Sequence, residues 1–466
     1  MSGARRRAAV VQRDIMLQIS RSTRRLATHL RIIYSELQTA HPDGSTDGEV
    51  GLQQFAKRYK AEMYLCAQQL LEEMQSAAGG DEHDELEAEL TRTQWAYTIW
   101  DLAMIVFVAH PAVLTERLVP WWQLHLRHPQ EEEEEEELCN AEQPGEQPNF
   151  WSVLRKLVVH GMPQSAVRLL QRLRGAAGYE IEQLLLRLEA LLEMCPRLTE
   201  PELLQPQPEE RALGQLEMQL LADFQQQWRV WNADVVALLR DADAASLSGA
   251  PLAAEVRATA ALLSGDDDAI GAAAPTWHEQ LLARLLYQQP TLLRWQVAEL
   301  LPACVSRADE AALDPFQAVL LAILRDDPYA TMRALREAYG EGWLLAHLWD
   351  LLWRARAVGD ECMHGSPLSV REHFVLQYSR ALGGCAGLWQ LVALYAADLL
   401  ERPQPCGAAR AWLGELLVAQ DATHAPRVRK LLGLCERHGL HDAARAILEK
   451  AAEHKRAHRT AGRAAA

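Results

Sequence analysis

The sequence feature that most constrains the fold is a helical pattern that stops at a glycine and begins again directly after it. In the stretch NFWSVLRKLVVHGMPQSAVRLLQRLRG, apolar residues lie 11, 8, 7 and 4 positions before Gly161 and 5, 8, 9 and 12 positions after it. Each set has helical spacing and therefore occupies one face of a helix. Gly161 can adopt the left-handed conformation that closes a helix, and Pro163 suits the first turn of the next. The stretch predicts an αα-hairpin.

The same frame recurs around Gly439, in PRVRKLLGLCERHGLHDAARAILEKAA, with apolar residues at identical offsets. A half-copy precedes Gly359, where a longer loop with Cys362, Gly365 and Pro367 interrupts it. The period is irregular, and any amphipathic hairpin can fall into this spacing by chance, so the frame favours a structural repeat without requiring one. One hairpin buries too little apolar surface to offset the conformational entropy lost on ordering it. It must therefore stack on neighbours, as helix pairs do in solenoids.

Composition favours helices along the whole chain of 466 residues. Leu, Ala, Arg, Glu and Gln dominate, β-branched residues are sparse, and no run alternates strictly as a half-buried strand does. We therefore predict an all-α protein, an α-solenoid of stacked antiparallel helix pairs. Helices are expected over 14–37, 53–75 and 95–108, and capping-box patterns open two more at Thr276–Glu279 and Ser369–Glu372.

We expect three regions along the chain. Residues 1–130 form a helical segment with a basic start, and residues 150–466 form the solenoid. Between them, the low-complexity stretch HPQEEEEEEELCNAEQPGEQP contains seven consecutive glutamates. Because these repel one another, the sequence predicts a disordered acidic loop over 131–149. A proline-rich stretch, 201–208, predicts a second flexible connection.

The net charge of −16 is unevenly distributed, since both ends are basic and the middle is acidic. Basic ends suggest contact with nucleic acid or membranes, but solvated helix faces and a flexible tail are the simpler explanation, and no aromatic residues interleave with the arginines to stack bases. The longest apolar stretch, 102–115, is too short to span a bilayer. Eight cysteines without paired spacing, and a start without an apolar signal segment, indicate a reducing compartment.

The sequence offers no strong catalytic or metal-binding motif. It lacks a glycine-rich phosphate loop, HExxH, GxSxG and paired CxxC, so we expect no catalytic residue, no cofactor, no metal and no small-molecule substrate. His125 and His128 could share a helix face as metal ligands, but two exposed histidines at a helix end suit the proline that follows them better. Cys362 and His364 supply only two of the four ligands that a structural zinc site needs.

Other histidines and tryptophans are interpreted as structural. His160 and His438 each precede a helix-ending glycine, where a cationic side chain stabilises the negative end of the helix dipole. The tryptophans at helical spacing are predicted to pack between layers of helices, namely Trp228, Trp231, Trp343, Trp349 and Trp353.

Several tryptophan-marked segments together resemble one known family, the nucleoporin 85 family of scaffold subunits in the nuclear pore outer ring. That family shows the same order of segments as FWSVLRKLVVHG, LLARLLYQQPTL, EGWLLAHLWDLL, VREHFVLQYSRALGGCAGLWQLVALY and RKLLGLCERHGL. The earlier WAYTIWDLAMIVFV fits as well, so the resemblance covers most of the chain from Trp95 to Gly462. Each segment alone is weakly specific, and the ordered set is fairly specific.

The resemblance implies an α-solenoid that folds back on itself, of the kind shared with vesicle-coat scaffolds. It also implies a place at the nuclear envelope in the Y-shaped outer-ring complex, where contacts with other Y-complex nucleoporins support pore assembly, mRNA export and protein import without catalysis. The alternative is a cytosolic helical-repeat adaptor for peptides or trafficking proteins. A third hypothesis, an all-α enzyme, would need converging titratable groups that the sequence does not show.

The sequence departs from the family pattern at both ends. Family members carry an N-terminal β-blade that completes a small WD-repeat propeller partner, whereas this chain opens with a basic helical pattern. The family solenoid continues beyond the position that matches Gly462, whereas this chain ends in RTAGRAAA, as a partial or divergent product would. The resemblance alone therefore does not predict binding to the propeller subunit or to the hub of the Y.

Overall fold

The computed structural model describes residues 21–40, 49–77, 80–109, 113–173, 179–197, 210–247, 251–310, 312–340, 342–362, 368–383, 388–401 and 406–464. Within these ranges the chain is helical and contains no β-strand, which confirms the all-α prediction. Isolated bridges join Val113 to Leu293 and Cys362 to Ser369. The chain divides into two compact units, one formed by 1–108 together with 328–466 and the other by 109–327.

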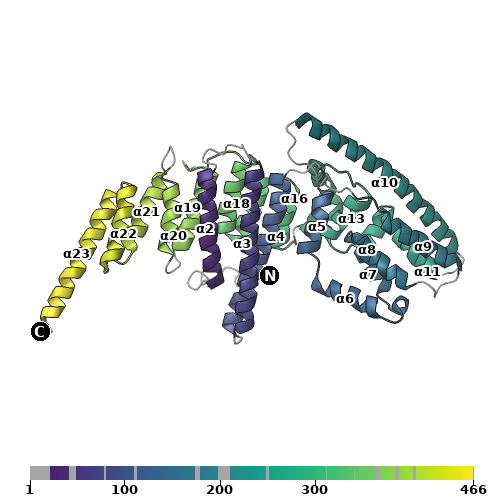
Figure 1. Ribbon diagram of the computed structural model, residues 1–466, viewed down its shortest axis with the longest axis horizontal. Helices are drawn as coiled ribbons and strands as arrows, with labels where there is room; N and C mark the ends of the chain where they lie inside the picture. Colours follow the sequence, from purple (N-terminus) through teal and green to yellow (C-terminus); the bar gives the residue numbers. More distant parts are fainter. Residues whose placement is uncertain are drawn as a thin grey trace. The chain divides into compact units, whose positions relative to one another are not determined.

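The discontinuous unit combines early and late helices. Its first part contains α2 (Arg21–Ala40), α3 (Glu49–Ser76), α4 (Asp81–Met104) and the π-helical η1 (Ile105–Ala109), which reaches the boundary. Its second part contains α17 (Pro328–Tyr339), α18 (Trp343–Arg354), α19 (Val370–Gly383), α20 (Trp389–Asp398), α21 (Gly407–Ala419), α22 (Ala425–Arg437) and α23 (His441–Ala464). In Figure 1, α2 lies beside α20 and α3 beside α18. This unit therefore folds back on itself, as the family resemblance implies.

A buried polar layer joins the early and late helices of this unit. His347 on α18 is buried, and its Nδ1 and Nε2 atoms each lie 2.9 Å from a tyrosine hydroxyl, those of Tyr59 on α3 and Tyr395 on α20. The carboxylate of Asp350, on the same helix, accepts a hydrogen bond of 3.0 Å from the amide of Gln38 on α2. Buried polar groups persist where they find hydrogen-bond partners. These bonds therefore fix how α2 and α3 pack on α18 and α20.

The continuous unit, 109–327, is a second array of short helices. It contains α5 (Thr115–His125), α6 (Pro129–Asn140), η2 (Pro144–Glu146), α7 (Phe150–Val159), α8 (Pro163–Arg172), α9 (Tyr179–Glu193), α10 (Glu210–Leu247), α11 (Pro251–Leu263), α12 (Asp267–Ala273), α13 (Trp277–Tyr287), η3 (Arg294–Gln296), α14 (Val297–Cys304), α15 (Arg307–Glu310) and α16 (Pro315–Leu324). The long α10 packs on α9 and α11, and α7 contacts α8, α11, α12 and α13. Successive helix pairs therefore cover one another's apolar faces.

Helix α6 lies where the sequence analysis expected a disordered loop over 131–149. Tertiary contacts explain the difference, because Arg127 and Arg168 pair with the buried Glu135 at 2.7 and 3.1 Å. The ring of His128 caps the first turn, where glutamates also suit the positive end of the helix dipole. In the sequence, the glutamate run indicates only mutual repulsion. The arginines that balance its charge lie outside the run and come close only in the folded chain.

Both glycine frames close their helices in the same way. Gly161 and Gly439 have φ angles of 66° and 63°, and the residue after each donates a backbone hydrogen bond to the carbonyl five positions earlier, at 2.9 and 2.8 Å. This is the Schellman arrangement that the glycines predicted. In the half-copy, α18 instead closes at Arg356, whose φ is 58°, three residues before Gly359.

Most other expectations for single elements are confirmed where the structure describes them. The helices expected over 14–37 and 53–75 correspond to α2 and α3, although residues 14–20 lie outside the described residues. The helix expected over 95–108 begins earlier, at Asp81, and its last residues are π-helical in η1. The capping boxes at the starts of α13 and α19 are both formed. Of the tryptophans predicted to pack between helices, Trp231 and Trp349 are buried, whereas Trp228, Trp343 and Trp353 are only partly buried. The proline-rich stretch 201–208 lies outside the described residues. None of the described helices is long and apolar enough to cross a bilayer.

Candidate functional site

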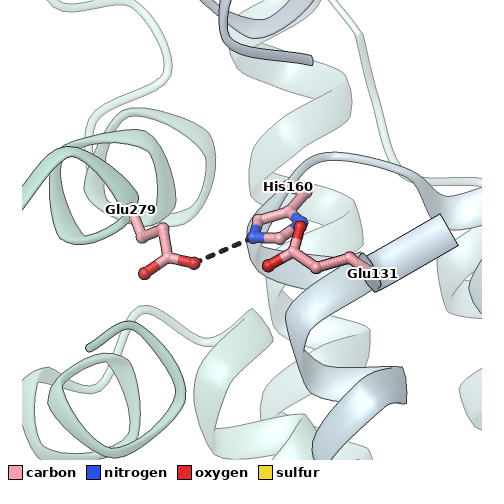
Figure 2. Close-up of side chains that lie close together, drawn as sticks. All are labelled: Glu131, His160 and Glu279. Atoms are coloured by element: carbon pink, nitrogen blue, oxygen red, sulfur yellow. Dashed lines mark hydrogen bonds and ion pairs between the residues drawn. The ribbon is translucent and has the colours of Figure 1, made fainter. Parts of the chain in front are cut away.

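Three titratable side chains from separate helices meet inside the 109–327 unit. Figure 2 shows Glu131 from α6, His160 from the end of α7 and Glu279 from α13, with the carboxylate of Glu279 beside the imidazole ring and that of Glu131 in front of it. Among the described residues, this is the one group of three or more potential ligands for a metal ion, with one ligand atom of each residue within 4.8 Å of the others. It is therefore the candidate site of this unit.

His160 is placed by the closure of α7. It is the C-cap residue, and Gly161 turns the chain so that the ring enters the core, where it is 1% exposed. Gln123 donates a hydrogen bond of 2.9 Å to the His160 carbonyl, and Arg197 donates one of 2.7 Å to the Gly161 carbonyl. These bonds satisfy carbonyl groups that the end of a helix leaves without partners. The position of the His160 ring therefore follows from the helix end at Gly161, which the sequence pattern predicts.

Glu279 serves two neighbours at once. Its Oε2 completes the capping box of α13 by accepting hydrogen bonds from the hydroxyl and backbone N–H of Thr276, at 2.6 and 3.0 Å. Its Oε1 lies 3.0 Å from Nε2 of His160. Burial alone would raise the pKa of Glu279, but hydrogen bonds from His160 and Thr276 outweigh it and lower this pKa to about 2. The site therefore contains a buried ionised carboxylate.

Glu131, in the first turn of α6, lies nearest to the second ring nitrogen of His160. Its Oε2 lies 3.7 Å from Nδ1 of His160, and its Oε1 lies 3.8 Å from the ammonium group of Lys156. The Oε2 atom is buried and has no hydrogen-bond partner. The side chains of Glu131 and Lys156 are 20% and 32% exposed, so this is the side of the cluster that solvent can reach.

Aromatic side chains cover the part of the cluster that faces away from solvent. The ring of Trp122, on α5, lies over that of His160 with 4.1 Å between centroids. Its indole N–H donates a hydrogen bond of 3.0 Å to Nδ1 of His278, which must therefore be unprotonated at that atom. Burial lowers the pKa of His278 to about 4, so that ring is neutral. The packing of Trp122 on the His160 ring, together with the hydrogen bond between Nε2 and Glu279, holds this imidazole in one orientation.

The pairs considered from the sequence do not form such a cluster. His125 ends α5 beside Trp121, and His128 caps α6, so both occupy helix ends as the sequence indicates. Neither they nor Cys362 belongs to a described group of three potential metal ligands. His364 lies outside the described residues.

The dipole interpretation of the two glycine-linked histidines needs revision. His160 does end a helix, but its ring is hydrogen-bonded to Glu279 and lies 3.7 Å from Glu131, two carboxylates on other elements that the sequence pattern did not indicate. Those carboxylates are 29 positions before it and 119 after it, and no local pattern links such positions. At His438, burial lowers the pKa, which works against the cationic form that the dipole would favour.

Known protein families were compared with the sequence of the whole chain. The sequence matches the profile of the family described as "Nup85 Nucleoporin" over residues 10–466. The chain belongs to this nucleoporin family. Both the order of helical segments and the fold-back of the discontinuous unit agree with the resemblance seen in the sequence.

Similar proteins come from animals and plants. The chain is 25% identical to "Nuclear pore complex protein Nup85" of Danio rerio over 434 residues, which are 91% of this chain and 62% of that protein. It is 22% identical to the Homo sapiens protein of the same description, over 72% of this chain and 48% of that protein, and 23% identical to the Arabidopsis thaliana protein, over 64% and 44%. The chain thus spans less than two thirds of the length of these Nup85-family relatives.

Proposed function

We propose that the chain is a structural subunit of the nuclear pore scaffold, built into the Y-shaped outer-ring complex at the nuclear envelope. The observation that carries this proposal is the Nup85-family match over residues 10–466 in a chain whose described part consists of stacked helices. In this function the protein binds other Y-complex nucleoporins through helix faces and supports nucleocytoplasmic transport without catalysing a reaction. Affinity comes from buried apolar surface and from many simultaneous contacts.

A comparison of the two glycine frames supports binding through α23. Leu170 and Leu448 occupy the same offset, nine residues after Gly161 and Gly439, yet Leu170 is 1% exposed and Leu448 is 52% exposed. Leu170 is covered by other helices of its array, whereas α23 packs on α21 and α22 and leaves Leu448 open. We expect another outer-ring nucleoporin to cover this face, because an apolar frame position gains most when a further layer stacks on it.

The alternative is a cytosolic helical-repeat adaptor. All three relatives compared above are described as nuclear pore complex proteins, which favours the scaffold. Localisation of the fluorescently tagged chain separates the two functions. We expect a rim around the nucleus, and a diffuse cytosolic signal would contradict the scaffold function and favour the adaptor.

A matched pair of variants tests the proposed contact of α23. Leu448→Glu places a charge on the open face and should reduce recovery of outer-ring subunits with the tagged chain, because burying an unpaired charge is costly. Leu124→Glu introduces the same change at a residue that is 63% exposed on α5 and should leave recovery unchanged. Equal recovery with both variants, with helical circular dichroism preserved, would exclude this face as a contact. Recovery of a small WD-repeat propeller subunit in the same experiment tests that partner separately.

A further inference from the structure

The cluster of Glu131, His160 and Glu279 contains more negative than positive charge. Two carboxylates approach one imidazole, and Lys156 is the only other cation paired with them among the described ion pairs, at 3.8 Å. Glu279 is 4% exposed, and the Oε2 atom of Glu131 is buried without a hydrogen-bond partner. When the imidazole is neutral, the two carboxylates carry more negative charge than Lys156 can balance. Buried charge is costly unless it is paired or coordinates a metal.

Two of the three ligand atoms are spaced nearly as in a tetrahedral metal site. Zinc bonds nitrogen and carboxylate oxygen at about 2.0–2.2 Å, so neighbouring ligand atoms in a tetrahedron are about 3.4 Å apart. Nε2 of His160 and Oε1 of Glu279 lie 3.0 Å apart, and one ligand atom from each of the three residues lies within 4.8 Å of the others. In Figure 2 the carboxylate of Glu131 stands over the ring. Its Oε2 lies 3.7 Å from Nδ1, the other ring nitrogen, so sharing an ion on Nε2 requires the Glu131 side chain to swing toward that nitrogen. This side chain is the most exposed of the three and is therefore the one able to move.

We propose that Glu131, His160 and Glu279 bind a single Zn²⁺ ion that joins α6, α7 and α13, with water as the fourth ligand. A mixed set of imidazole and carboxylate ligands suits zinc, whereas magnesium and calcium prefer oxygen ligands alone. The two ionised carboxylates balance the charge of the divalent ion, and the imidazole ligand is neutral, so the occupied site has no net charge.

Neighbouring groups are arranged as supports for metal ligands usually are. Thr276 holds the second oxygen of Glu279, and Trp122 packs on the ring of His160. The partly exposed side chains of Glu131 and Lys156 provide the route of entry. The site would act structurally, because the ion would tie α6 to the hairpin of α7 and to α13. It goes beyond the scaffold function, which needs no metal.

The test uses the full chain after removal of metals with a chelator. Isothermal titration with zinc chloride should show one ion bound per chain, and Co²⁺ should give the intense visible absorption of a tetrahedral site. Glu131→Gln and His160→Gln should each weaken binding by about tenfold or more. Hydrogen exchange of the α6 amides should slow when Zn²⁺ is added to the unmodified chain, because the ion binds only the folded state.

A control distinguishes the site from the glutamate run around it. Glu136 is exposed on the same helix, so Glu136→Gln removes the same charge and should leave zinc binding unchanged. The proposal is overturned if the chain binds no zinc, if Glu131→Gln and Glu136→Gln weaken binding equally, or if His160→Gln binds as the unmodified chain does. Should His160→Gln fail to fold, the comparison of the two glutamate variants on the surface of α6 still decides.

Discussion

At the level of single residues, His347 shows how the discontinuous unit is held together. Each of its ring nitrogens lies 2.9 Å from a tyrosine hydroxyl, and in the neutral imidazole one nitrogen donates a hydrogen bond while the other accepts one. Burial lowers the pKa of His347 to about 3, although the carboxylate of Asp350 opposes this shift. The folded unit therefore excludes a proton that the unfolded chain would bind.

This depressed pKa predicts how stability depends on pH. The unfolded chain binds the proton near the ordinary histidine pKa of about 6.5, whereas the folded chain does not bind it until about pH 3. The contribution of the neutral ring is therefore complete above about pH 6.5 and is lost as the pH falls below it, by up to about 1.4 kcal/mol per pH unit. Urea unfolding of the unmodified chain and of His347→Gln, between neutral and mildly acidic pH, should show the difference between them shrinking by that slope.

The control for this measurement is His441→Gln, which replaces an exposed histidine in the same unit. Its unfolding free energy should follow that of the unmodified chain at every pH. If the unmodified chain and His347→Gln also run parallel, the ring of His347 does not exclude a proton in the folded state.

A second residue-scale prediction concerns Asp350. It is fully buried and pairs with Arg354 at 3.0 Å and Arg371 at 3.3 Å. Asp350→Asn should cost about 3–5 kcal/mol of unfolding free energy, because it leaves buried guanidinium groups without a counter-charge. Glu36→Gln breaks the pair with Arg58 between α2 and α3, where both side chains are nearly half exposed, and should cost no more than about 1 kcal/mol. Similar losses for the two variants in chemical unfolding would show that the buried network contributes little.

At the level of helices, the two glycine frames share backbone closure but differ in packing. A Cβ atom on Gly161 would lie 3.0 Å from a methyl carbon of Val119 and 3.1 Å from a guanidinium nitrogen of Arg197. A Cβ atom on Gly439 would meet nothing nearer than 3.7 Å. Replacing Gly439 by alanine therefore introduces backbone strain alone. Replacing Gly161 by alanine introduces the same strain and also crowds the neighbouring side chains.

Gly439→Ala should destabilise its hairpin by about 1–2 kcal/mol, the cost of a left-handed conformation for an L-residue. Gly161→Ala should cost about 1–3 kcal/mol more, because the surrounding side chains must also move. Hydrogen exchange of α7–α8 and of α22–α23 measures each hairpin in its own unit. Equal effects at the two sites would mean that the neighbours of Gly161 yield without cost.

The sequence predicted elements better than it predicted the contacts between them. Glycine frames, capping boxes and the helical periodicity of α2 to α4 are local, so the backbone chemistry of a few residues decides them. The helix α6 was missed because its stability depends on Arg168, which lies beyond the next helix. Glu131, His160 and Glu279 were missed for the same reason, since only packing of α6 and α13 around α7 brings them together. Among single positions, the left-handed Arg356 shows that a helix can also close without glycine.

At the level of the whole chain, each unit is an array in which helices cover one another's apolar faces. The buried polar layers around His347 and Glu279 fix which helices meet, since a shift in pairing would leave these groups without partners. Such a body offers shape and exposed helix faces to its partners. We therefore expect its contribution to the pore to be spread over several contacts, of which the face carrying Leu448 is one.

The most direct test of the scaffold account is affinity isolation of the tagged chain from nuclear envelopes, followed by mass spectrometry. The account predicts that other outer-ring nucleoporins are recovered in fixed proportion to the chain, and that this proportion is retained after washing with salt because apolar helix faces carry the contacts. Recovery of the intact chain without any outer-ring nucleoporin would contradict it.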